Sequence, residues 1–195
     1  GDENFSEPFS AWILTPVYMS TSDFDLDFVF LGFADSLGAI GKAEDEFRKA
    51  GQRIGDKWER VTNCSGQSLN FNVEARAPKN EWVEGAVNYT SIESCSLKEG
   101  KTNNDLKAND ELWNNYLDEA GFEGGYWRWW PETGSPTDND FDYLLAVDFS
   151  SIEEYGNARD NRIESMMAGT RPELIHDCNT PRLYESTNVR LRLAE

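Results

Sequence analysis

The chain repeats a pattern of residues at a constant offset of 115 positions, so that Trp12 and Pro16 match Trp127 and Pro131. Further matches at this offset are Asp23/Asp138, Asp25/Asp140, Asp27/Asp142, Phe28/Tyr143, Ser36/Ser151, Leu37/Ile152, Gly41/Gly156, Ala43/Ala158 and Asp45/Asp160. After slips of one residue, Asn63-Cys64 aligns with Asp177-Cys178 and Asn72-Val73 with Asn188-Val189. Solenoid units repeat every 20 to 50 residues or so, and this period is far longer. The repeat therefore predicts the duplication of a domain.

Each copy is predicted to run strand, hairpin, strand, helix, strand. Aromatic and β-branched runs predict the strands, and Asp-rich turns at 20–25 and 134–140 separate the first two strands of each copy. Ser36 and Ser151 fit the N-caps of the helices that follow. The predicted strands are 9–18, 26–34 and about 58–75 in copy one, and 125–131, 141–149 and about 173–192 in copy two.

Residues between the copies add a strand at 86–97 and a helix from Thr102 to Ala120, which Gly121 ends. Copy two, at 86–195, is then a complete β-α-β-β-α-β unit, which is the ferredoxin-like order. Copy one, at 1–77, lacks the opening strand and helix. We expect either that the natural protein begins further upstream or that copy one borrows these elements, and a second chain that fills the gap would make a homodimer.

This pattern resembles the dimeric α+β barrel superfamily, in which two ferredoxin-like sheets pack face to face with helices outside. The chain also resembles uncharacterised tandem-repeat proteins of marine bacteria that carry Leu-Lys-Glu-Gly-Lys-Thr, here 97–102, before the first helix. The resemblance implies an α+β fold in which tandem ferredoxin-like repeats form a barrel-like pseudo-dimer. The superfamily contains monooxygenases, haem-degrading enzymes, dismutases, lyases and ligand binders, so the fold alone selects no function.

Charge excludes several classes of partner. The chain has 36 Asp and Glu against 18 Lys and Arg, a net charge of −18, which disfavours binding to nucleic acid or to anionic membrane surfaces. No apolar run approaches the roughly 20 residues of a membrane helix. Hydrolase, kinase, dehydrogenase and zincin motifs are absent, so no cofactor or metal is expected.

The three cysteines are Cys64, Cys95 and Cys178, with no C-x-x-C pair. The ferredoxin-like order makes the first and last strands neighbours, which would place Cys95 beside Cys178. A disulfide there fits an exported protein, whereas buried thiols fit a cytoplasmic one. Residues 1–4 do not resemble a signal peptide, and Gly1 without a preceding Met suggests trimming, as is usual for exported proteins. We expect a secreted or periplasmic protein, with a cytoplasmic one as the alternative.

His176, the only histidine, is a candidate general base or metal ligand. Strand alternation places it on the same face as Cys178 and opposite Asp177, so no His/Asp dyad forms, and a structural role is the more common one. The two D-x-D-x-D turns lack the Gly and Glu that an EF-hand loop requires, which favours solvated hairpins over calcium sites.

The densest aromatic run is Tyr126-Trp127-Arg128-Trp129-Trp130. On a strand, Trp127 and Trp129 face one side, while Tyr126, Arg128 and Trp130 face the other. One set would pack under helices and the other would line a barrel interior, where Arg128 could meet an anionic ligand. The alternative is that all are core aromatics and Arg128 pairs with a surface carboxylate. Arg182 and Tyr184 are weaker candidates of the same kind.

Two functions remain open. The first is a small-molecule-binding or structural α+β barrel protein without catalysis. The second is a cofactor-independent enzyme, similar to the superfamily's monooxygenases or lyases, that uses His176 and Arg128. An enzyme of this type predicts a closed pocket in which these two side chains converge.

Overall fold

The structure is a computed structural model that describes residues 6, 9–18, 26–64 and 66–191. The elements in chain order are β1 (Ser10–Val17), β2 (Val29–Phe33), α1 (Leu37–Ala50), α2 (Gln52–Trp58), β3 (Leu69–Arg76), β4 (Val87–Leu97), α3 (Asn103–Glu119), β5 (Tyr126–Thr133), β6 (Tyr143–Phe149), α4 (Ile152–Ala168), β7 (His176–Cys178) and β8 (Arg182–Arg190). The protein is thus of mixed α+β class.

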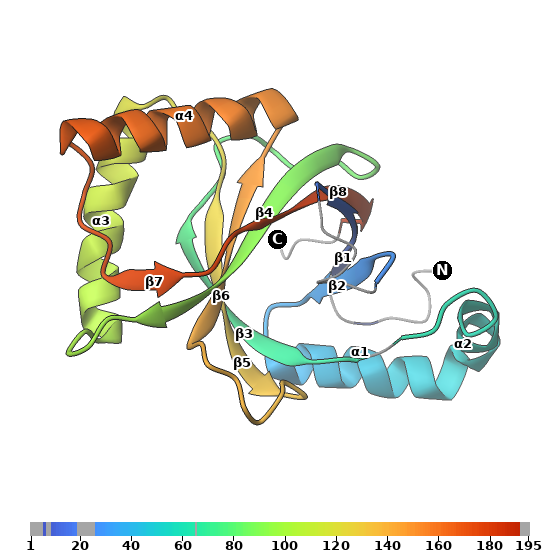
Figure 1. Cartoon of the computed structure of the whole chain (residues 1–195). Helices are drawn as coiled ribbons and strands as arrows, with labels where there is room; N and C mark the ends of the chain where they lie inside the picture. Colours follow the sequence, from blue (N-terminus) through green and yellow to red (C-terminus); the bar gives the residue numbers. More distant parts are fainter. Residues whose placement is uncertain (1–5, 7–8, 19–25, 65, 192–195) are drawn as a thin grey trace.

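All described strands belong to one antiparallel sheet that curls into a half-barrel (Figure 1). The strand order is β2-β1-β8-β4-β6-β5-β3, and the short β7 pairs with β4 beside this path. Strands from the two halves of the sequence are hydrogen-bonded to each other, β1 to β8 and β3 to β5. Residues 1–77 and 86–195 therefore contribute to a single shared sheet.

Short polar side chains start the three long helices. Ser36 Oγ accepts from the Ala39 N–H at 3.0 Å before α1, and Ser151 Oγ accepts from the Glu154 N–H at 3.0 Å before α4. Thr102 and Asp105 form a reciprocal capping box at the start of α3. Each cap satisfies a backbone N–H that the first helical turn leaves unpaired. All three helices begin where the sequence predicted.

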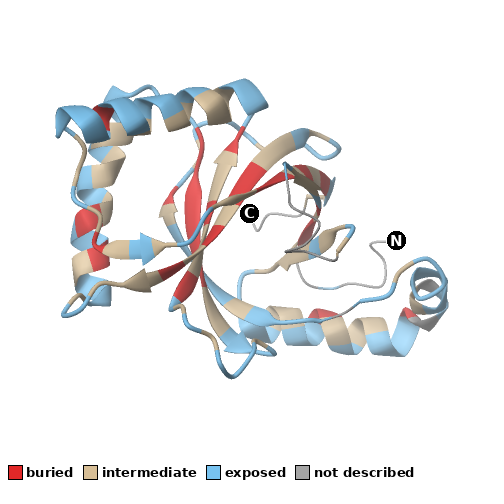
Figure 2. Cartoon of the chain, in the orientation of Figure 1, coloured by how far each residue is buried: buried red, intermediate tan, exposed pale blue. Residues whose placement is uncertain are grey.

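The sheet has two buried faces with different partners. Helices α3 and α4 cover the outer face (Figure 1), where Cys95, Tyr143 and Ile175 pack against Leu106 of α3. The inner face of the curl carries two further clusters, built around Trp12, Leu14 and Tyr184 and around Trp127, Trp129 and Ala146. Figure 2 shows the buried residues concentrated on the central strands. The strand alternation in the sequence therefore supplies apolar side chains to both faces.

Two predicted strands differ from the structure. The strand expected at 58–75 is β3, which begins only at Leu69, and helix α2 ends at Trp58. The indole of Trp58 packs edge-on against Phe28 and Phe30, at 5.8 Å between ring centroids in each pair, so aromatic residues are used here for tertiary packing of a helix. The strand expected at 173–192 is divided into β7 and β8. Pro181, which lacks a backbone N–H to donate to the sheet, lies in that break. The turn expected at 20–25 lies outside the described residues.

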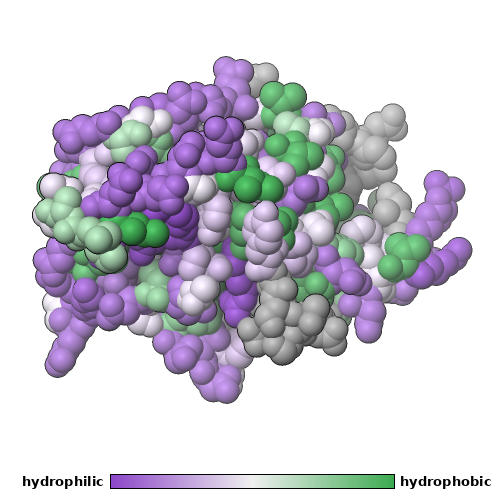
Figure 3. Space-filling model, turned by 45° about the horizontal axis from the view of Figure 1, so that its top comes forward, coloured by the Kyte–Doolittle hydropathy of each residue, from purple (hydrophilic) through white to green (hydrophobic). Residues whose placement is uncertain are grey.

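The described surface is mainly hydrophilic on the side shown in Figure 3, with hydrophobic residues in separate patches. Among the described residues, no helix combines the length and the hydrophobicity needed to cross a membrane.

Candidate functional site

A cavity of about 510 Å³ lies against the inner face of the half-barrel. Its walls come from the inner faces of the sheet strands, from the start of α1 and from the two strands at the ends of the sheet, β2 and β3. This volume falls within the range of about 300–1,000 Å³ that is usual for small-molecule sites. The curl of the sheet therefore produces a concave surface large enough for an organic ligand.

Five of the aromatic rings that line this cavity contact one another, and we call them the aromatic cluster: Trp12, Phe33, Trp82, Trp127 and Trp129. Trp82 contacts Trp12 and Trp127, at 5.4 Å and 5.6 Å between ring centroids. Phe33 contacts Trp12 at 5.3 Å and Trp129 at 6.0 Å. The rings meet at steep or oblique angles rather than in parallel stacks, so the cavity wall presents both ring faces and ring edges.

Asp148 of β6 is a carboxylate in the same cavity. Its oxygens accept from Thr90 Oγ1 at 2.8 Å and from Trp82 Nε1 at 3.4 Å. Burial raises the pKa of Asp148 from 3.8 to about 6, the two hydrogen bonds oppose this rise, and the nearby Glu154 adds to it. Above pH 6 the site therefore carries a half-buried negative charge that no Lys or Arg in the described part of the chain neutralises.

Two further polar groups of the cavity lie beside the tryptophans. Glu74 of β3 accepts from Trp127 Nε1 at 3.3 Å. Trp129 is 6% exposed, and its buried Nε1–H has no hydrogen-bond partner among the described residues. A buried donor without a partner is costly, so a ligand acceptor at this position would relieve a free-energy penalty.

The structure divides the predicted aromatic run between the two faces of β5. Trp127 and Trp129 line the cavity, while Tyr126 and Arg128 face α3. Arg128 forms a bidentate ion pair with Asp110 of α3, in which Nη2 contacts Oδ1 and Nη1 lies 2.8 Å from Oδ2. The expectation that Arg128 meets an anionic ligand in the barrel interior does not fit this placement, because strand alternation turns the guanidinium away from the cavity.

Trp130, Arg182 and Tyr184 also lie outside the set of cavity-lining residues. Trp130 packs on Tyr143 at 4.8 Å between ring centroids, on the face that α3 covers. Tyr184 is 3% exposed and packs with Trp12 and Leu14 in the inner core. Arg182 begins β8, opposite Ile92 of β4.

His176 contacts the outer face of the sheet. Its Nδ1 lies 2.6 Å from the Tyr143 hydroxyl, and the Arg128 guanidinium lies over the same tyrosine ring at 5.6 Å. Burial, with the positive charge of Arg128 as the next largest cause, lowers the pKa of His176 from 6.5 to about 4. His176 and Arg128 therefore converge on Tyr143 next to α3, and neither lines the cavity.

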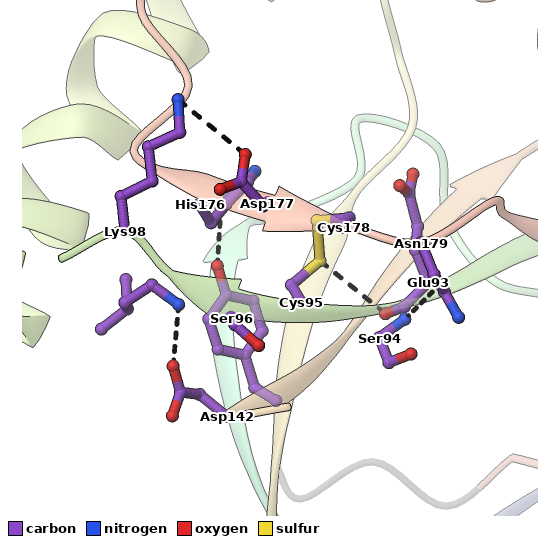
Figure 4. Close-up of a disulfide and its surroundings, with 12 residues drawn as sticks. Glu93, Ser94, Cys95, Ser96, Lys98, Asp142, His176, Asp177, Cys178 and Asn179 are labelled. Atoms are coloured by element: carbon purple, nitrogen blue, oxygen red, sulfur yellow. Dashed lines mark hydrogen bonds and ion pairs between the residues drawn. A yellow bond between two sulfur atoms is a disulfide. The ribbon is translucent and has the colours of Figure 1, made fainter. Parts of the chain in front are cut away.

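Cys95 of β4 and Cys178 of β7 form a disulfide, as expected from the strand order (Figure 4). The bond lies between paired strands, and Asn179 beside it accepts from the Ser94 N–H at 2.9 Å through Oδ1. Cys64 is exposed and free. The disulfide thus attaches β7, and with it His176, to the centre of the sheet.

No group of three or more His, Cys, Asp or Glu side chains in the described ranges is arranged to hold a metal ion. Asp23 and Asp25 of the first D-x-D-x-D turn lie outside those ranges.

Sequence reasoning did not select the residues that give the cavity its chemistry. Asp148 was detectable in principle as the one acid in the apolar run of β6, on the same face as Ala146. Trp82 lies in the connection between β3 and β4, where no periodic pattern indicates which way a side chain points. Its role depends on the tertiary path of that connection.

No family model matches the chain, and no curated protein matches it.

Proposed function

We propose that the protein binds a small organic molecule in the inner cavity of the half-barrel. The observation that carries this proposal is the indole N–H of Trp129, which has no hydrogen-bond partner in the described part of the chain and is buried beside a cavity of about 510 Å³. A core built only for stability would fill such a space with packed side chains and pair its buried donors. The aromatic cluster would supply the contact area that binds an apolar part of the ligand.

A blocked cavity tests this proposal. Asn72 lies opposite Trp129 in the β3–β5 register and lines the cavity, whereas the neighbouring Val73 faces the other side of β3. Both side chains are exposed, so replacement of either by Trp should leave the fold intact. Ligand-observed NMR with a mixture of small neutral, cationic and anionic organic molecules should detect binders to the parent protein and to V73W, but not to N72W.

A mixture without binders, or one whose binders are retained equally by N72W, would overturn the proposal. Circular dichroism of both variants checks that they fold alike. The two variants differ only in the face of β3 that carries the added indole.

A second candidate function is lyase-like proton abstraction without a cofactor. The observation that favours it is Asp148, whose pKa of about 6 suits a general base near neutral pH. His176 and Arg128 lie on the outer face of the sheet, away from the cavity, so their positions do not support a catalytic role for them there. Turnover of a cavity ligand that D148N abolishes would identify an enzyme, and binding without turnover would identify a binding protein.

We further propose that the fold consists of tandem ferredoxin-like repeats related by duplication, similar to the dimeric α+β barrels. Within the second half, the strand order β8-β4-β6-β5 supports this, because it follows the 4-1-3-2 order of a ferredoxin-like sheet. In the first half, β1, β2 and α1 occupy positions 115 residues before β5, β6 and α4, to within a few residues at their ends. The opening strand and helix have no counterpart among the described residues of the first half.

Export from the cytoplasm is also a proposal, which the disulfide between Cys95 and Cys178 supports. Thiol alkylation of the protein in its native source tests it. Modification of Cys64 alone is the expected result, and modification of all three cysteines would favour a cytoplasmic protein.

A further inference from the structure

The charges that line the inner cavity have one sign. The described lining residues include Asp35, Glu74 and Asp148, and none of them is Lys, Arg or His. The two most buried arginines, Arg76 and Arg128, are paired with Asp118 and Asp110 and point toward α3. The protein therefore keeps its buried positive charges on the other face and leaves the cavity negative.

Of these three carboxylates, Asp148 should attract a ligand cation most strongly, because it is half-buried next to indole rings. Among the described residues, its hydrogen-bond donors are both neutral, namely Thr90 Oγ1 and Trp82 Nε1. Neutral hydrogen bonds compensate a buried carboxylate less well than an opposite charge does. A ligand cation in the cavity would supply that opposite charge.

The aromatic cluster favours the same kind of ligand. The ring of Trp82 meets that of Trp12 at 74° and that of Trp127 at 37°, so the three rings form a corner rather than a parallel stack. Indole faces attract cations through the ring quadrupole, and aromatic corners of this kind bind alkylated ammonium groups, which are too large and too weakly hydrated to prefer water strongly. The carboxylate and the indoles thus select one ligand class.

We propose that the inner cavity binds a small organic cation, an alkylated ammonium compound, with Asp148 as its counter-ion and the aromatic cluster as its cage. This inference rests on the proposed small-molecule function and specifies its ligand class. A hydroxyl or carbonyl oxygen on the ligand would accept from the unpaired Trp129 Nε1–H.

Three probes of nearly the same shape test the charge requirement: choline, 3,3-dimethylbutan-1-ol and 3,3-dimethylbutanoate. They carry a positive charge, no charge and a negative charge on similar branched skeletons. Isothermal titration at pH 8 should show choline binding at least tenfold more tightly than the neutral alcohol, and no binding of the carboxylate.

Variants assign the effect to the cavity. D148N should weaken choline binding about tenfold and leave the weak binding of the alcohol unchanged, while D138N, the same substitution at an exposed turn, should change neither. Far-ultraviolet circular dichroism and unfolding curves confirm that both variants are folded.

Equal or tighter binding of the alcohol or the carboxylate would overturn the cation inference and leave small-molecule binding in place. An absence of choline binding would also overturn it, and the N72W and V73W comparison would then decide separately whether the cavity binds any other molecule.

Discussion

Burial of Asp148 has a cost that depends on pH. Its pKa is about 6 in the folded protein against an ordinary value of 3.8, so the folded state holds this proton more tightly than the unfolded chain. The stability contributed by the protonated form is complete below pH 4 and is lost as the pH rises to 6. Above pH 6 the loss amounts to about 3 kcal/mol. A carboxylate retained at this cost is typical of a functional position rather than a structural one.

The D148N variant should therefore be more stable than the parent protein at pH 8. Removal of the buried charge stabilises the folded state by up to about 3 kcal/mol. The amide nitrogen cannot accept a hydrogen bond as the carboxylate oxygen did, so one of the two hydrogen bonds is lost, which costs about 1 kcal/mol. We expect a net gain of about 2 kcal/mol in the free energy of unfolding by urea. A variant less stable than the parent at pH 8 would show that the charge is well compensated.

The contribution of His176 to the stability of the fold changes with pH in the opposite direction. Its pKa of about 4 lies below the unfolded value of 6.5, so its contribution to stability is complete above pH 6.5 and is lost as the pH falls to 4. Between pH 4 and 6, the pH-dependent stability contributions of Asp148 and His176 therefore partly cancel in the parent protein.

The D148N background should expose the effect of His176. We expect the stability difference between D148N and D148N/H176Q to fall by about 3 kcal/mol from pH 7 to pH 4. Urea unfolding of both variants at several pH values across this window measures the difference. The other carboxylates are present in both variants, so their effects are removed when the two are compared. A difference that stays constant would mean that His176 is solvated in the folded protein.

At the scale of elements, β7 is held to the sheet by few contacts. It has three residues and pairs only with β4 among the described strands, and the disulfide links these same two strands across 83 residues of chain. Closing a loop of this length restricts the unfolded chain strongly, and chain-entropy models assign it roughly 4 kcal/mol.

The double variant C95A/C178A should lose about that amount of unfolding free energy in guanidinium chloride. C64A, which removes the exposed free thiol, is the matched control and should unfold like the parent. Hydrogen exchange of the His176 and Asp177 amides should accelerate first, since they depend on β7. Unchanged stability without the disulfide would show that β7 packing alone suffices.

The first residues of helices α1, α3 and α4 could be predicted because they depend on hydrogen bonds between neighbouring residues. Ser36, Thr102 and Ser151 have side chains that bond to the helix beginning beside them, and the sequence contains that information. The division of the last strand and the helical state of the segment ending at Trp58 depend on distant partners, and propensity alone missed them.

The candidate site was predictable only in part for the same reason. The alternation of Trp127 and Trp129 against Arg128 follows from strand geometry, and it correctly separated the two sets. Which set faces the cavity depends on where α3 packs, and in the structure Arg128 lies on the face toward that helix, where it pairs with Asp110.

At the scale of the whole molecule, the described sheet ends in two strands that each pair on one side only, β2 and β3. Apolar side chains are exposed on both: Phe30 is 49% exposed and Phe71 is 55% exposed. Free strand edges with exposed apolar residues favour association with further strands. A homodimer through these edges remains our proposal for the assembly.

Size-exclusion chromatography with light scattering tests it. We expect a species of twice 22.2 kDa at high micromolar concentration in 0.5 M salt, and weaker association in 20 mM salt, since each chain carries −18 charges. F71K should weaken association, whereas V61K, which adds the same charge at an exposed site outside the sheet, should not. A monomer under all conditions would contradict the proposal.

The pairing of β1 with β8 also governs how the chain reaches its native state. Ala11 and Asn188 are hydrogen-bonded although they lie 177 positions apart in the sequence, so β1 cannot pair with β8 until the chain between them has been synthesised. Contacts of this sequence separation slow folding, because the entropy of closing the chain is lost before the contact forms. A nascent chain that has not yet exposed β8 would present the hairpin of β1 and β2 with an open edge. The half-barrel can therefore assemble only after β8 has been synthesised.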